Sequence, residues 1–154
     1  MFFEVLVEGG ADRPVVKEVL QRRFGLKEGR QFRIHPHKGK GRLPDNPLAT
    51  PDRKHRGLLD QLPAKLRGMS WMGSDYCMVV LVDADDQKCS QLKQSLIELC
   101  QSLDKKPENV LFRIAIEETE SWFIADLEAV KRAYPNANLG RLQDIEPDSG
   151  FIFN

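Results

Sequence analysis

The chain has 154 residues, of which 41% are hydrophobic and 30% are charged, and its 23 basic and 23 acidic residues give a formal net charge of zero. This composition is typical of a soluble globular protein with one domain and a buried core. No apolar run approaches the roughly 20 residues of a membrane-spanning helix, so we expect no membrane association. The opening MFFEVLVEGG lacks the basic region and cleavage signature of a signal peptide, which predicts a cytoplasmic protein.

Hydrophobic periodicity and turn residues divide the chain into strands and helices. FFEVLV at 2–7 and YCMVVLV at 76–82 have the apolar, β-branched character of buried strands. The first helix has end signals in Asp12, an expected N-cap, and Gly25. In chain order, the predicted elements are a strand at 2–7, a helix at 12–24, a strand near 31–35, an irregular segment at 35–56, a helix near 58–66, a strand at 76–82, a helix through 92–103, a strand at 110–116 and a helix through 123–134.

Strands that alternate with helices favour right-handed crossovers and a parallel sheet. We therefore predict a compact Rossmann-like α/β fold, a mostly parallel four-stranded sheet with helices on both faces. The domain is expected to span residues 1–135, with a basic loop insertion at 35–56. Residues 136–154 are expected to form a C-terminal tail or an edge element.

The predicted loop concentrates positive charge. Residues 30–56 contain eight lysines and arginines but only two aspartates, and they hold all three histidines of the chain. This segregation indicates a polyanionic partner such as a nucleic acid, and the alternative is a solvated basic loop without a partner. The candidate phosphate-binding residues are His35, His37, Lys38, Lys40 and Arg42.

Zinc is a weaker prediction. A site formed by the three histidines His35, His37 and His55 lacks a cysteine at a suitable spacing. The three cysteines are widely spaced, so we expect them to be reduced and near apolar surface: Cys77, Cys89 and Cys100.

Acidic residues follow three of the predicted strands. Glu8 follows the first strand, Asp83 and Asp85 follow the third, and Glu117 with Glu118 follows the fourth. Because the carboxyl ends of parallel strands meet at one edge of a sheet, these side chains are expected to converge. Crowded carboxylates repel one another unless a cation neutralises them, and oxygen ligands favour Mg²⁺ or Mn²⁺. The spacing of Asp83 and Asp85 is expected to place both on the same side of the strand end.

The segments VLVEGGAD and VVLVDADD, which contain Glu8, Asp83 and Asp85, resemble the Toprim domain of primases, topoisomerases, recombination-mediator proteins and overcoming-lysogenization-defect (OLD) nucleases. The resemblance covers residues 1 to about 132. With the segment from Arg113 to Trp122, it is greatest to small uncharacterised bacterial Toprim-like proteins related to the OLD-type nucleases. It implies that Glu8 is a general acid/base in phosphoryl transfer and that the two aspartates bind Mg²⁺.

Further acids are similar to those that OLD-type nucleases use for a second metal ion, and the resemblance implies the same role for Asp12, Glu118 and Glu120. Their alternative role is to stabilise helix N-termini. One departure concerns the residues after Asp85. Primases and many topoisomerases have a glycine there, whereas this chain continues Asp86-Gln87-Lys88. The departure argues against a primase or topoisomerase.

These features predict a metal-dependent phosphodiester-processing enzyme, nuclease-like or phosphate-transferring, that acts on nucleic acid with Mg²⁺ or Mn²⁺. The alternative is a non-catalytic adaptor that binds nucleic acid or a partner protein, for example in a phage-defence module. A glycosyltransferase that binds a nucleotide-sugar through Asp83 and Asp85 is less favoured, because the chain is small and has a glycine-rich turn after its first strand.

Overall fold

The computed structural model describes residues 1–85, 87–115, 127–133 and 135–136. The chain forms two compact units, Met1–Ile116 and Glu117–Asn154. In the second unit the described helix is α5, Leu127–Ala133, which falls within the helix predicted through 123–134. The sheet and the other helices that the structure describes belong to the first unit.

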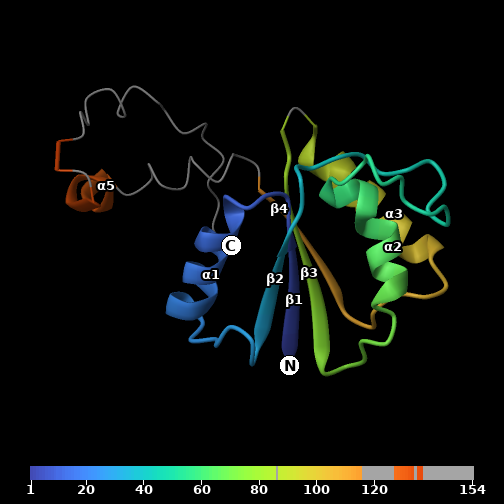
Figure 1. Ribbon diagram of the computed structural model, residues 1–154, viewed down its shortest axis with the longest axis horizontal. Coiled ribbons are helices and arrows are strands. Elements are labelled where there is room, and N and C mark those ends of the chain that lie inside the picture. Colours follow the sequence, from blue (N-terminus) through green and yellow to red (C-terminus); the bar gives the residue numbers. More distant parts are fainter. Residues whose placement is uncertain (86, 116–126, 134, 137–154) are drawn as a thin grey trace. The chain divides into compact units, whose positions relative to one another are not determined.

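The first unit is built on a parallel sheet of four strands in the order β2-β1-β3-β4 (Figure 1). The predicted fold class is therefore confirmed. β1 lies in the interior of the sheet, where Val5 pairs with Ile34 of β2 on one side and with Val79 of β3 on the other. The strands are β1 (Phe2–Val7), β2 (Phe32–Pro36), β3 (Tyr76–Asp83) and β4 (Val110–Ala115).

Helices cover both faces of this sheet (Figure 1). One face carries α1 (Asp12–Glu18), which continues as the π-helix η1 (Val19–Arg23). The other face carries α2 (Leu58–Gly68) and α3 (Cys89–Ser102). Alternate residues of β1 point to opposite faces, and for this reason Val5 and Val7 pack with Val16 of α1, whereas Leu6 packs under α2.

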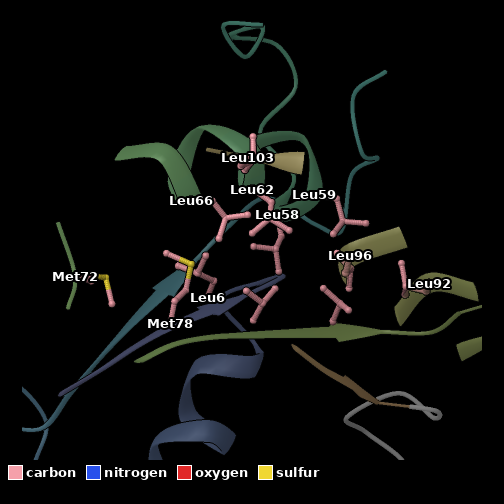
Figure 2. Close-up of a cluster of buried hydrophobic side chains, with 12 residues drawn as sticks. Leu6, Leu58, Leu59, Leu62, Leu66, Met72, Met78, Leu92, Leu96 and Leu103 are labelled. Atoms are coloured by element: carbon pink, nitrogen blue, oxygen red, sulfur yellow. The ribbon is translucent and has the colours of Figure 1, made fainter. Parts of the chain in front are cut away.

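The larger core lies between the sheet and the helices α2 and α3 (Figure 2). Leu58, Leu62 and Leu66 of α2 are fully buried against the sheet. Each such leucine stabilises the fold by about 1.5–3 kcal/mol relative to an exposed side chain. Pro63 lies inside α2 and lacks the N–H that a helix needs, but the helix continues through it. The burial of the neighbouring leucines offsets the missing bond.

The structure differs locally from the sequence prediction at the start of α1 and in the burial of β3. Asp12 is the first residue of α1 rather than its N-cap, which is Ala11, so the N-cap prediction was wrong. In β3, Met78, Val80 and Val82 are fully buried towards α2 and α3, whereas Val79 and Leu81 on the other face are only partly buried against the α1 core. The three cysteines are free thiols, as expected. Among the residues that the structure describes, no helix combines the length and apolar character of a membrane span.

Candidate functional site

The carboxyl ends of β1 and β3 meet at Glu8 and Asp83. Glu8 Oε1 accepts a hydrogen bond of 2.8 Å from the backbone N–H of Asp83, although the two residues lie 75 positions apart in the chain. The parallel pairing of β1 with β3 brings them together. We call the group Glu8, Asp83 and Asp85 the acidic rim.

Asp85 reaches the rim through a turn. Its φ angle is 48°, in the left-handed region that residues other than glycine seldom adopt. The regular alternation of β3 has therefore ended before Asp85. The strand alternation on which we based the placement of Asp85 therefore does not extend to this residue, although the charges of both aspartates act on Glu8.

Lys40 of the basic loop lies against the rim. Its Nζ is 2.9 Å from Asp85 Oδ2 and donates a second hydrogen bond, of 3.1 Å, to the carbonyl oxygen of Ala84. The Lys40 side chain is 14% exposed and that of Asp85 is 51% exposed. A pair as accessible as this contributes at most about 1 kcal/mol to stability. The main effect of the Lys40–Asp85 pair is to hold the ammonium group of Lys40 next to the carboxylates of the rim.

Glu8 has an altered acidity. Its pKa is raised from 4.5 to about 7, first because burial disfavours the ionised form and then because Asp83 and Asp85 are negatively charged neighbours. The hydrogen bond from Asp83 and the charge of Lys40 act in the opposite direction. A carboxyl group with this pKa can both accept and release a proton near neutral pH.

The start of the basic loop is joined to the sheet and to α2. The N–H of Gly39 donates to the Glu8 carbonyl at 2.8 Å. The N–H groups of Leu58 and Leu59, at the first turn of α2, donate to the carbonyls of Gly39 and Lys40 at 2.8 and 2.7 Å. Backbone hydrogen bonds therefore hold Gly39 and Lys40 between Glu8 and the first turn of α2.

Asp60, for which the sequence predicted no role, holds the basic loop against the start of α2. Its carboxylate accepts hydrogen bonds from the N–H groups of Gly57, at 2.9 Å, and Arg42, at 3.1 Å. An acidic residue three positions after a helix N-cap is a known capping pattern, and this spacing was the available signal. The loop also needs small residues here, because a Cβ on Gly57 would lie 2.5 Å from the Cα of Gly41.

The other predicted site residues have varied positions. Asp12 Oδ2 accepts the N–H of Gly9 at 2.8 Å and so holds the turn after Glu8. His35 is part of β2 rather than of an irregular loop, and it pairs with the buried Glu4 of β1. His37 Nδ1 bonds to the carbonyl oxygen of Val7 at 2.9 Å. The candidates Glu118 and Glu120, together with Glu117 and Asp86, lie outside the described residues.

The chemistry of the rim suits a hard cation. Its donors are carboxylate oxygens, the ligands that Mg²⁺ and Mn²⁺ prefer, and their mutual repulsion contributes to the raised pKa of Glu8. Within the described part of the chain, no three His, Cys, Asp or Glu side chains already form a ligand group.

Comparison with protein families gives one match. The family model described as "Domain of unknown function (DUF4276)" matches residues 7–149, a range that includes the acidic rim, the basic loop and α2. Comparisons with curated proteins and with solved structures found no match. Since the family model matches most of its length, the chain belongs to the DUF4276 family.

Proposed function

We propose that this protein is a metal-dependent phosphodiester-processing enzyme, nuclease-like, that acts on nucleic acid at the acidic rim. The observation that carries the proposal is Glu8, a carboxyl group with a pKa of about 7 that is hydrogen-bonded to the strand end bearing Asp83. Such a group is suited to proton transfer at neutral pH. The lysine at the same place supplies the charge that a phosphate needs.

In this proposal Asp83 and Asp85 hold Mg²⁺ or Mn²⁺, with Glu8 beside them. When bound, the ion neutralises charge on the scissile phosphate and makes a water molecule more acidic. Glu8 accepts a proton from the attacking water or donates one to the leaving oxygen. The N–H of Asp83 orients the Glu8 carboxyl through Oε1 and leaves the second oxygen, Oε2, for the reaction.

Lys40 has two roles in this mechanism. In the absence of the metal ion, the ammonium group of Lys40 balances the charge of Asp85 through their ion pair. With a substrate present, its ammonium group is near enough to pair with a phosphate oxygen. Exchange of Lys40 between Asp85 and the phosphate would couple substrate binding to metal binding at the rim.

The test is a cleavage assay on labelled DNA and RNA, with Mg²⁺, Mn²⁺ or chelator. Glu8→Gln keeps the size of the side chain and an oxygen for the Asp83 N–H, but it cannot transfer a proton. Cleavage should fall at least about 100-fold, the lower range for a lost general acid or base. The matched control is Glu108→Gln, an exposed residue that precedes β4 at the opposite end of the sheet, and it should cleave at the wild-type rate.

A Glu8→Gln protein that cleaves as fast as the wild type would show that Glu8 has no catalytic role. The adaptor alternative predicts a different pattern: neither protein cleaves in any metal, and both bind nucleic acid equally in chelator.

A further inference from the structure

An open surface pocket of about 540 Å³, which we call the cavity, lies beside the basic loop and is lined by none of the acidic-rim residues. It is bounded by the end of β2, by the loop residues 51–56 and by the middle of α2. Its volume is in the range of small-molecule sites and is large enough for one or two nucleotide units. The residues that line it include His37, Lys38, Asp52, Arg53, Arg56 and Lys65.

The lining is strongly basic. It holds four cationic side chains and one carboxylate, that of Asp52. The Asp52 carboxylate accepts the backbone N–H of Lys54 at 2.9 Å, so it is already engaged within its own turn. Within the described residues, no ion pair involves any of the four cations: Lys38, Arg53, Arg56 and Lys65. Like charges gathered around a cavity repel one another, and an anion relieves that repulsion.

His37 forms part of the cavity wall but adds little positive charge. Burial lowers its pKa, and the nearby charge of Lys65 lowers it further. With the ring neutral, Nδ1–H donates to the Val7 carbonyl and Nε2 is a buried acceptor with no partner among the described residues. The positive charge of the cavity therefore comes from its lysines and arginines.

Hydrogen bonds fix the cavity walls. The Gln61 side chain of α2 donates to the His55 carbonyl at 2.6 Å, and Arg67 of α2 donates to the carbonyls of Pro47 and Ala49. The N–H of Lys38 donates to the carbonyl of Arg56 at 3.1 Å. Such preorganisation lowers the entropic cost of ordering the site around a ligand.

The cavity and the rim share one segment of chain. Lys38 lines the cavity, whereas Lys40, two residues later, contacts Asp85. Gly39 between them is bonded to the carbonyl of Glu8. The cavity and the rim are therefore lined by residues of the same short, backbone-anchored segment, Lys38 to Lys40.

We infer that this cavity binds adjacent phosphate groups of a nucleic-acid strand and holds the strand whose scissile bond lies at the rim. This inference rests on the proposed function for the position of the scissile bond. The binding chemistry rests on the cavity itself, because guanidinium groups pair with phosphate oxygens through two parallel hydrogen bonds. A free nucleotide triphosphate presents the same chemistry and is the competing source of phosphates.

The experiment measures the binding of a fluorescent oligothymidylate over a range of salt concentrations, in chelator so that cleavage does not contribute. The double variant Arg53→Gln/Lys65→Gln removes one cation from each wall. The matched control, Lys93→Gln/Lys105→Gln, removes two exposed lysines that do not line the cavity, with the same change in net charge. Two lost single-strand contacts should reduce the salt slope by about 1.4, which means about 25-fold weaker binding at about 0.1 M salt. The control should leave both values at wild-type level.

The outcomes separate this inference from the proposed function. Equal slopes for the cavity variant and the control would overturn the cavity site, even if Glu8-dependent cleavage persists. Weakened binding by the cavity variant alone would support the site, even if no protein cleaves. If the double variant does not fold, Lys65→Gln alone should reduce the salt slope by about 0.7, half of the reduction expected for the double variant. Stronger competition by a nucleotide triphosphate than by an oligothymidylate of equal phosphate content would assign the cavity to free nucleotides and overturn the strand inference.

Discussion

The raised pKa of Glu8 makes a prediction about stability that does not depend on any activity. A carboxyl group whose pKa is higher in the folded protein than in the unfolded chain stabilises the fold fully below the unfolded value of 4.5. That contribution is lost as the pH rises through the folded value of about 7, because the burial and the negative neighbours then oppose an ionised group.

The size of the effect follows from the shift. A change in pKa from 4.5 to about 7 corresponds to at most about 3 kcal/mol of unfolding free energy. Glu8 is only half-buried, so solvent screening reduces the expected loss to about 1–2 kcal/mol. Glu8→Gln removes the ionisation and should remove this loss, while the amide oxygen keeps the bond to the N–H of Asp83.

The assay is urea unfolding of both proteins in chelator, at about pH 5 and about pH 8. The stability of Glu8→Gln relative to wild type should rise by about 1–2 kcal/mol between the two pH values. Glu108→Gln, the exposed control, should show no such change. A difference between Glu8→Gln and wild type that is the same at both pH values, or that falls with pH, would refute the environment we describe for Glu8.

Three further predictions concern the rim and its supports. Lys40→Met removes a charge that lowers the pKa of Glu8, so the Glu8 carboxyl should titrate at higher pH in an NMR titration. An unchanged pKa of Glu8 would show that the ammonium group of Lys40 does not lie near the acidic rim. Mg²⁺ should raise the melting temperature of the wild type by mass action, and Asp85→Asn should lose most of that response; a full response in the variant would place the ion elsewhere. Gly57→Ala should cost about 1–3 kcal/mol in urea unfolding, because its Cβ would meet the backbone of Gly41. The matched change Gly68→Ala, at a helical position with nothing within 4 Å, should be neutral or stabilising by up to about 1 kcal/mol. Equal costs would mean that Gly41 and Gly57 do not approach closely.

The sheet and the convergence of its acids could be predicted from the sequence because both depend on short-range patterns. Apolar runs and turn residues define the strands, and parallel topology then brings their carboxyl ends together. Glu8 and Asp83 meet for that reason. To predict this contact it was enough to know where β1 and β3 end and that they are parallel.

The environment of the basic loop could not be predicted in the same way. Its contacts join residues that have no periodic relation, such as Lys40 with Asp85 and Arg67 with Pro47. The grouping of Arg53 with Lys65 around a cavity depends on how α2 lies over the loop. The left-handed turn at Asp85 has no sequence signal either, since glycine is the usual residue in such a conformation.

The bond between Glu8 and Asp83 also bears on how the protein is made. A ribosome synthesises β1 first, but the partner that orients Glu8 is added 75 residues later, and β3 must pair with β1 before the bond can form. Pairing of strands so distant in sequence is a slow step in folding. A nascent chain that ends before β3 therefore contains Glu8 but not the Asp83 N–H that orients its carboxyl group. The rim is assembled only when most of the first unit has emerged.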